Sequence, residues 1–378
     1  MITIQNVKLF LSALTLAAKI AVNKKAKIMP GLAAVRLTVN EDGNLVTLAT
    51  DLVTWQRSTL EICNPQDSAM DIAVNAKALL AVIKKLKDLG DISLGTDGNK
   101  LAIRNGRRKI SLDLCEDALP TMETPAFYAV TFDKAHFSEA LSFAARTISS
   151  DADYRRHLTC LHVEGRSVGA RLVSTDGHRL SKVDARGESG YLNGDMDIPG
   201  GTVAAMERSI AQTNGNAPKV TLLRSDKYAG LSVGPHYVMG ALESIDYPPY
   251  EKVIPSWSDV ELTADVEDVR GAFDLASSIH TGTKRAALAF HPTDNTMDVS
   301  SYDTDTGEIR ESLHVQYTKG QDVAPDLEVG FNVAYILDAV KGRKGAISLA
   351  FRDDTGPVSI TGGMDNATAL SLVMPLRP

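Results

Sequence analysis

Apolar residues recur along the chain with two different periods. In six stretches they follow the spacing i, i+3, i+4 and i+7, which is typical of one face of an α-helix. Val7, Phe10 and Leu14 mark the first of these stretches. We therefore predict helices over residues 6–21, 75–89, 134–149, 200–213, 266–281 and 332–341.

Between these stretches the period changes to two, which is typical of half-buried strands. Residues 1–4, 92–94, 101–103 and 110–114 are examples. Asp97-Gly98 and Asn105-Gly106 are turn signals that separate the last three of these strands. Short strands joined by tight turns favour antiparallel sheets, so we predict an α+β fold.

One sequence segment occurs three times along the chain. The stretch ALTLAAK, which begins at Ala13, returns as ALSFAAR at Ala140 and as AFDLASS at Ala272. Aspartates at positions 51, 176 and 303 keep the same period. Solenoid repeats run to about 20–50 residues, whereas this period has the size of a whole domain. We predict three tandem copies, with domains at 1–124, 125–254 and 255–378 and proline-containing linkers at 119–125 and 248–255.

Composition changes this picture little. Hydrophobic residues make up 44% of the chain and charged residues 23%, which are ordinary values for a globular protein. The three cysteines, Cys63, Cys115 and Cys160, form no Cys-x-x-Cys pair, so a disulfide framework or a cysteine zinc site is not expected. We expect no metal and no cofactor, and a reducing cytoplasmic location.

The apolar segment 9–18 leaves one alternative open, because with Lys8 before it a signal peptide is conceivable. The same segment recurs inside the chain, where a signal peptide has no place. A first strand followed by a core-packed helix is the better interpretation.

Charge is distributed unevenly over this acidic chain, whose net charge is −7. Basic residues recur on or after the predicted helices, and in the first copy no acidic residue precedes Glu41. They include Lys8, Lys19, Lys24, Lys25, Lys27, Lys77, Lys84, Lys85, Lys87, Arg155, Arg156, Lys284, Arg285, Lys341, Arg343 and Lys344. An acidic protein with basic helical faces indicates a polyanion held against a chosen surface. The alternative is that these lysines only solvate helix faces.

Several catalytic signatures are missing from the sequence, including the phosphate-binding loop, the Gly-x-Ser-x-Gly elbow and the His-Glu-x-x-His motif. One cluster resembles a base and its orienting acid, namely Asp176 with His178. The matching Asp51 has no histidine beside it, and an Asp-Gly pair is commonly just a turn. We therefore expect no enzyme, although a hydrolase using Asp176 and His178 stays open.

Four motifs, in order along the whole chain, carry a family resemblance. They are STDGHRL at 174–180, YPPYEKVIP at 247–255, FNVAYIL at 331–337 and VMPLR at 373–377. With them the chain resembles the β subunit of bacterial DNA polymerase III, the sliding clamp. This resemblance implies three copies of the DNA-clamp fold, two chains joined head to tail in a ring, helices lining the hole and sheets outside. It also implies no catalytic activity.

The partners implied are duplex DNA bound without regard to sequence, the polymerase III α subunit, the clamp loader δ subunit and other proteins with a clamp-binding motif. The location implied is the cytoplasm, at the nucleoid. A sliding ring needs diffuse attraction to phosphates, which basic residues on inner helices would supply. A triplicated scaffold without a DNA role remains the alternative.

The resemblance also assigns residues to three sites. A partner-peptide pocket is expected from Arg155, Leu158, Thr175, Gly177, His178, Arg179, Leu180, Pro248, Val253, Tyr335, Thr355, Pro357, Leu372, Met374, Pro375, Leu376 and Arg377. DNA-facing residues are expected at Lys24, Lys25, Lys27, Lys84, Arg155, Arg156 and Lys284, and a dimer interface at Ile110, Leu112 and Ile279. Departures from the family pattern stand at Arg156, His157, Pro249, Ser278 and Pro378, and they bear on partner affinity and ring stability.

Overall fold

The structure is a computed structural model that describes residues 1–21, 29–63, 70–117, 119–122, 124–151, 155–213, 215, 217–279, 285–320, 328–365 and 367–376. The chain forms two compact units, each described here by itself. The first unit holds residues Met1–Lys134 and Glu188–Glu243, and the second holds Ala135–Gly187 and Ser244–Pro378. The middle third of the chain is thus divided between the units, and the bounds of the three predicted domains stay a prediction.

The six predicted helices are all present. They are α1 (Val7–Ala21), α2 (Ala76–Leu86), α3 (Lys134–Ala145), α4 (Gly200–Gln212), α5 (Val266–Ser278) and α6 (Val333–Val340). Four of them begin at a side-chain cap, because Asn6, Asn75, Asp265 and Asn332 each accept a hydrogen bond from a backbone N–H of the first turn. Short 3-10 helices add η2 (Pro30–Ala33), η4 (Arg156–Leu158) and η5 (Tyr250–Val253).

Antiparallel sheets complete the first unit. Its strands are β1 (Ile2–Ile4), β2 (Ala34–Val39), β3 (Asn44–Thr50), β4 (Thr54–Glu61), β5 (Asp71–Asn75), β6 (Ile92–Asp97), β7 (Lys100–Asn105), β8 (Arg108–Asp113), β9 (Tyr128–Asp133), β13 (Ser189–Gly190), β14 (Met196–Pro199), β15 (Lys219–Arg224), β16 (Tyr228–Val233) and β17 (His236–Ala241). One sheet runs β1-β6-β7-β8, and another runs β13-β9-β15-β16-β17-β4-β3-β2-β5.

The second unit is built in the same way. Its strands are β10 (Cys160–Arg166), β11 (Gly169–Thr175), β12 (Arg179–Arg186), β18 (Val260–Asp265), β19 (Arg285–His291), β20 (Thr296–Asp303), β21 (Gly307–His314), β22 (Gln316–Lys319), β23 (Glu328–Asn332), β24 (Ala346–Phe351), β25 (Val358–Gly362) and β26 (Ala367–Val373). One sheet runs β10-β11-β12-β26-β25-β24-β18-β22, and another runs β21-β20-β19-β23. The α+β prediction, with antiparallel sheets, is confirmed.

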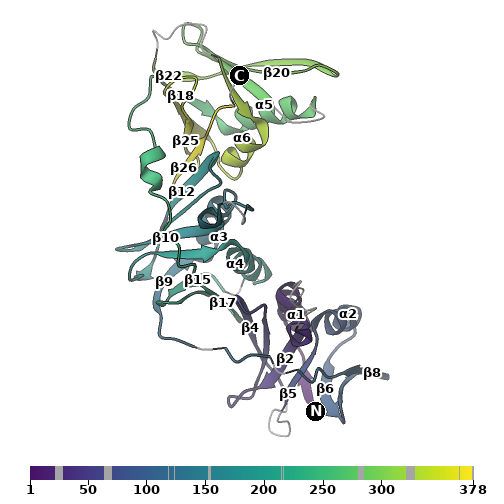
Figure 1. Cartoon of the computed structure of the whole chain (residues 1–378). Helices are drawn as coiled ribbons and strands as arrows, with labels where there is room; N and C mark the ends of the chain where they lie inside the picture. Colours follow the sequence, from purple (N-terminus) through teal and green to yellow (C-terminus); the bar gives the residue numbers. More distant parts are fainter. Residues whose placement is uncertain are drawn as a thin grey trace. The chain divides into compact units, whose positions relative to one another are not determined.

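The repeat is visible in how strands of successive copies join. In the first unit β17, the last strand of the middle copy, pairs with β4 of the first copy. In the second unit β26, the last strand of the final copy, pairs with β12 of the middle copy. The helices repeat too, since α1 packs beside α2 and α5 beside α6 (Figure 1).

The aspartate landmarks of the sequence all lie in one kind of turn. Asp51, Asp176 and Asp303 each follow or end a strand, and each carboxylate accepts a hydrogen bond from the backbone N–H two residues later. Such a turn satisfies the backbone where a hairpin reverses. The period seen in the sequence is therefore a repeated hairpin.

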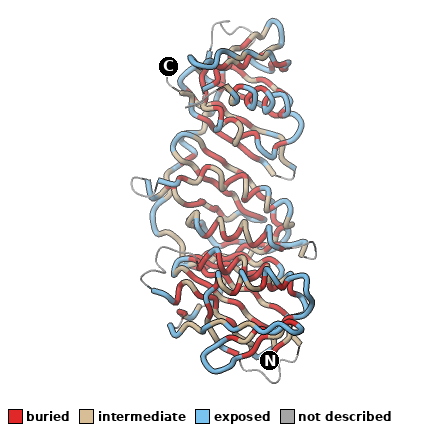
Figure 2. Tube along the Cα trace, turned by 90° about the vertical axis from the view of Figure 1, so that its right-hand side faces the viewer, coloured by how far each residue is buried: buried red, intermediate tan, exposed pale blue. Residues whose placement is uncertain are grey.

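Each unit buries one side of its helices against its sheets, and buried positions alternate with exposed ones along many strands (Figure 2). Val7, Phe10 and Leu14 of α1 are all buried, which confirms a core-packed first helix. No helix among the described residues is long and apolar enough to cross a membrane.

One of the predicted surface cations lies inside the core instead. Arg343 is 2% exposed, and its guanidinium donates hydrogen bonds to the carbonyls of Ala339, Gly362, Ala369 and Ile360 and to the hydroxyl of Ser371. Burial lowers its pKa to about 10. Its inclusion among the basic surface residues was wrong, because its charge serves to hold α6 against β25 and β26.

Candidate functional site

A cavity of about 330 Å³ opens on the second unit. It is lined by residues of η4, the β11–β12 turn, the segment through η5, and the end of β26 with the chain beyond it. The lining residues are Arg155, His157, Leu158, Thr175, Gly177, His178, Arg179, Leu180, Pro248, Pro249, Tyr250, Val253, Pro357, Leu372 and Met374. We call this cavity the groove.

The floor of the groove is apolar and firmly packed. Leu158, Leu180 and Leu372 are each almost fully buried. The rim differs, because Val253 is 57% exposed and Met374 is 41% exposed. Covering these apolar rim residues with a ligand removes them from water and so favours binding. A flexible methionine also adapts to the ligand's shape.

A tight turn forms the polar wall of the groove. Asp176 Oδ1 accepts hydrogen bonds from the backbone N–H groups of His178 and Arg179, at 2.9 and 3.0 Å. Thr175 Oγ1 donates to the carbonyl of Arg179 and accepts from the N–H of Gly177, at 2.7 and 3.1 Å. The backbone of this wall is therefore held in place before any ligand arrives.

Glycine is required at the tip of this turn. Gly177 has φ of +88°, a conformation that side chains disfavour. A Cβ there would also lie 2.1 Å from Nη1 of Arg155, which donates to the carbonyl of Asp176 at 3.2 Å. The arginine thus packs directly over the glycine and closes one side of the groove.

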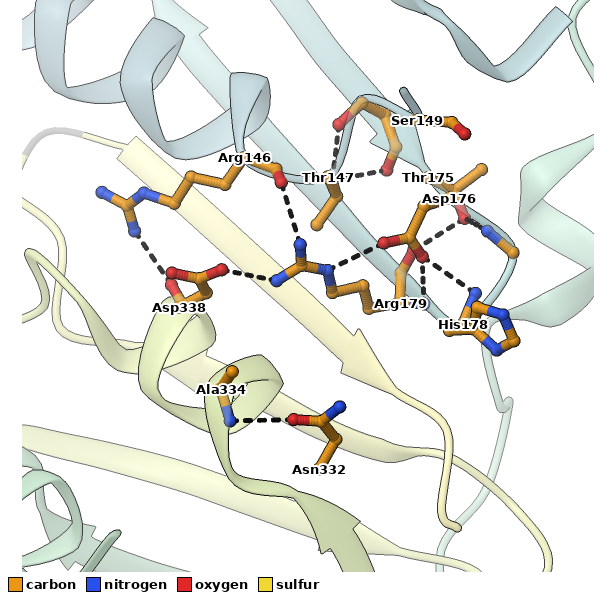
Figure 3. Close-up of polar contacts among 12 residues, drawn as sticks. Arg146, Thr147, Ser149, Thr175, Asp176, His178, Arg179, Asn332, Ala334 and Asp338 are labelled. Carbon is orange, nitrogen blue, oxygen red and sulfur yellow. Dashed lines mark hydrogen bonds and ion pairs between the residues drawn. The ribbon is translucent and has the colours of Figure 1, made fainter. Parts of the chain in front are cut away.

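Behind the turn lies a network of charges centred on Arg179 (Figure 3). Its Nε donates to Asp176 at 2.9 Å, and its Nη1 donates to Asp338 of α6 at 2.6 Å. Burial acts to lower the pKa of Arg179, but the hydrogen bonds to Asp338 and Asp176 outweigh it and raise the pKa overall. Arg146 reinforces the network from the end of α3, donating to the carbonyls of Asp338 and Lys341.

The described end of the chain belongs to the same structure. The N–H of Met374 donates to the carbonyl of His178 at 2.9 Å, and the N–H of Leu376 donates to the carbonyl of Gly330 at 2.8 Å. Residues 374–376 are thereby anchored to the turn and to β23, so they are not a frayed tail.

The structure brings most of the predicted pocket residues together around the groove. Four others lie nearby but outside its lining. Tyr335 stacks behind the wall, with its ring 6.4 Å from that of His178 and 4.4 Å from the guanidinium of Arg179. Thr355 bonds Asp353 within the β24–β25 turn. Pro375 and Leu376 follow the rim, and Arg377 lies outside the described residues.

Three lining residues were absent from the predicted pocket: His157, Pro249 and Tyr250. Tyr250 is fixed by a hydrogen bond of 2.5 Å from its hydroxyl to Glu164, and burial together with this bond raises its pKa. The sequence did offer signals, because Pro249 and Tyr250 lie inside the motif at 247–255, and His157 and Pro249 stand among the departures from the family pattern.

The arrangement of Asp176 and His178 offers nothing to the hydrolase alternative. The carboxylate of Asp176 is occupied by backbone N–H groups and by Arg179, while the imidazole of His178 stacks near Tyr335. No cluster of metal-ligating side chains was found among the described residues. Asp176 and His178 therefore belong to a structural turn.

The remaining predicted residues fall in several places. Lys84 is exposed on α2, and Arg155 and Arg156 are exposed at η4. Lys24, Lys25, Lys27 and Lys284 lie outside the described residues. Ile110 and Leu112 are half-buried on β8, and Ile279 is half-buried just after α5.

Comparisons with known proteins agree along the chain. Residues 1–126 match the family described as DNA polymerase III beta subunit, N-terminal domain, and residues 251–377 match its C-terminal domain. The beta sliding clamp of Vibrio cholerae is 25% identical over 352 residues, which cover 89% of this chain and 90% of that protein.

Solved structures share the fold. The DNA polymerase III beta subunit of Thermotoga maritima superposes with a TM-score of 0.86 at 22% identity, covering 100% of this chain and 99% of that one. The sliding clamp of Bartonella birtlesii, solved bound to griselimycin, gives a TM-score of 0.84 at 24% identity, covering 100% and 99%.

Proposed function

Because this chain belongs to the DNA polymerase III beta subunit family, the beta sliding clamps, we propose that its groove is where partner proteins dock. A sliding clamp is a processivity factor: it holds the replicative polymerase on duplex DNA and catalyses no reaction. The observation that carries the proposal is the groove itself, with an apolar floor, two exposed apolar rim residues and a preorganised polar turn.

The occupant that suits this groove is a short extended peptide of the type Gln-x-x-Leu-Phe. Its leucine and phenylalanine cover Leu158, Leu180 and Leu372, and burying each such side chain contributes about 1.5–3 kcal/mol. Its polar groups meet the backbone of the turn near His178. Most of the binding free energy therefore comes from two anchors.

A titration tests this docking site. A labelled Gln-x-x-Leu-Phe peptide is measured by anisotropy against the intact protein and against a chain that ends at Val373, which lacks the rim at Met374. We expect the truncated chain to lose binding of the peptide, of the polymerase α subunit and of the loader δ subunit. Its oligomeric state in solution should be unchanged. Equal affinity of both chains would place the site elsewhere.

We further propose that two chains join head to tail into a ring. Inside one chain, β17 joins β4 and β26 joins β12, so the last strand of a copy pairs with a strand of the copy before it. In the part of the chain that the structure describes, two corresponding strands have no such partner. They are β8, the last strand of the first copy, and β21, the strand of the last copy that corresponds to β4 and β12. Among the described residues, each of them pairs on one side only.

These two edges also match in charge. Arg108 and Lys109 of β8 are exposed, and β21 carries Glu308 and Glu311. Pairing β8 of one chain with β21 of another satisfies both edges, and two such seams close a ring. Ile110, Leu112 and Ile279 are the apolar residues expected at the seam.

DNA contact is assigned to basic residues on and after the helices. We propose that Lys24, Lys25, Lys27, Lys84, Arg155, Arg156 and Lys284 face or approach duplex DNA. Support comes from the exposure of Lys84, Arg155 and Arg156 on an acidic protein. Contacts to phosphates alone would allow sliding.

Neutralising Lys84 and Arg155 together tests this assignment on duplexes of unrelated sequence. We expect affinity to fall equally for all of them, with a smaller dependence on salt concentration. Unequal losses would show that bases are read and would contradict the assignment. A protein with this role acts in the cytoplasm, at the nucleoid.

A further inference from the structure

One wall of the groove continues into a second exposed surface. Val253 of the rim is followed four residues later by Trp257, which is 54% exposed. Pro357, another lining residue, directly follows Gly356 of the β24–β25 turn. Trp257 and Arg352 together make this surface, which we call the shelf.

The shelf has a defined geometry. The guanidinium of Arg352 lies 5.5 Å from the ring centroid of Trp257 and covers one of its faces. A Cβ placed on Gly356 would be 3.6 Å from Nε of Arg352, so the arginine stem lies against the residue that precedes Pro357. The shelf is therefore contiguous with the groove.

Both sides of the shelf are anchored. Asp353 Oδ1 accepts hydrogen bonds from the N–H groups of Thr355 and Gly356, at 2.9 and 2.6 Å. After Trp257, the N–H of Asp259 donates to the carbonyl of Phe351 at 2.8 Å. An exposed tryptophan held on a rigid base can bury a large area at little cost in conformational entropy.

The chemistry of the shelf favours an aromatic occupant over a charged one. Arg352 Nε donates to Asp353 Oδ2 at 2.7 Å, so its charge is already matched. Hydrogen bonds from Thr355 and Arg352 lower the pKa of Asp353, which keeps this carboxylate ionised. What remains available to a ligand is the face of the Trp257 indole that Arg352 does not cover.

We infer that the shelf binds an aromatic side chain that flanks the clamp-binding motif of a partner protein. This inference rests on the proposed docking site and extends it. An extended peptide advances about 3.3 Å per residue, so residues adjoining the motif run past the rim of the groove. Pairing of this aromatic side chain with Trp257 would then favour partner proteins that carry an aromatic residue next to the motif.

A peptide scan tests the shelf. One phenylalanine is moved through successive positions on either side of Gln-x-x-Leu-Phe, in a background of glycine and serine. We expect tighter binding, by about three- to tenfold, at one or two positions on one side only, which is the range of an aromatic pair. Trp257→Ala should abolish this gain, and Trp257→Phe should keep most of it.

The matched control is Val168→Ala, since Val168 is equally exposed on the second unit but does not line the groove. It should leave the gain unchanged. An independent readout comes from fluorescence, because the chain has two tryptophans and Trp55 is buried. The extended peptide should shift the emission of Trp257 to shorter wavelength and protect it from acrylamide.

The possible failures are distinguishable. If the unextended peptide binds but Trp257→Ala keeps the full gain, or no position gives a gain, the shelf is wrong and the docking site stands. If Trp257→Ala weakens both peptides equally, the tryptophan only shapes the groove and the inference is again wrong. If no peptide binds the intact protein, the docking site fails and the shelf fails with it.

Discussion

The imidazole of His236 lies in the core of the first unit between two hydroxyls. Ser58 is 2.8 Å from Nδ1, and Ser12 is 3.2 Å from Nε2. Burial lowers the pKa of His236 from 6.5 to about 4. The ring is therefore neutral at pH 7 and joins α1 to β4.

This shift predicts a loss of stability in mild acid. The unfolded chain binds a proton near pH 6.5, but the folded chain binds it only near pH 4, so stability is full above pH 6.5 and falls between these values. The loss approaches about 3 kcal/mol. Urea unfolding of the first unit at several pH values measures it. His236→Asn should remove this part of the pH dependence, and an unchanged slope would refute the assignment.

Two equivalent turns differ at the residue that follows the aspartate. Leu52 has φ of +76° at the place where the second unit has Gly177 at +88°. Leu52→Gly should therefore raise the free energy of unfolding by about 0.5–1 kcal/mol, since it relieves a conformation costly for leucine. Gly177→Ala should lower it by more than that and weaken peptide binding, because its Cβ meets Arg155. Urea midpoints check both, and the same sign for both substitutions would contradict the argument.

At the scale of elements, the ion pair between Arg179 and Asp338 ties the β11–β12 turn to α6. Asp338→Asn leaves the half-buried guanidinium of Arg179 with a weaker partner, so we expect the free energy of unfolding to fall by about 1–2 kcal/mol. This is less than the cost of breaking a fully buried pair, because Asp338 is partly exposed. Peptide affinity should fall several-fold as the wall loosens.

The control for this prediction is Lys344→Gln, which breaks an ion pair with Asp365 of similar length at 3.0 Å but on the surface. It should leave the stability almost unchanged, because water screens an exposed ion pair. Denaturant unfolding and peptide titration measure both variants. Equal effects would show that burial of the Arg179 pair has no energetic consequence.

The helices could be predicted from the sequence because apolar periodicity is a local signal. Their ends could not, since tertiary contacts decide them. The helix expected to reach residue 149 ends at Ala145, where Arg146 and Thr147 bond α6 and β11 instead. The first residue of another predicted helix, Asn75, is its cap.

The groove was accessible only through recognised motifs, because its residues come from distant parts of the chain. Tyr250 gave no separate signal, since its bond to Glu164 spans 86 residues. The burial of Arg343 was equally invisible, because its partners are backbone carbonyls that every sequence possesses.

For the whole molecule, the proposed seam gives the sharpest test. Ile279→Lys places a charge in an apolar contact between chains, and an unpaired buried charge is costly. We expect monomers in sedimentation velocity at concentrations where the unmodified protein is a dimer. Val168→Lys, an exposed position outside the seam, should remain dimeric. A full dimer of Ile279→Lys at low concentration would refute the placement.

The two edges, β8 and β21, also have a consequence for the behaviour of the separated chain. A strand with open N–H and C=O groups is a template on which other polypeptides add. Dilution, or a substitution that opens the ring, thus produces a species that precipitates or pairs out of register. The fraction of chains that exist as monomers and expose these edges should therefore fall as protein concentration rises through the dimerisation range.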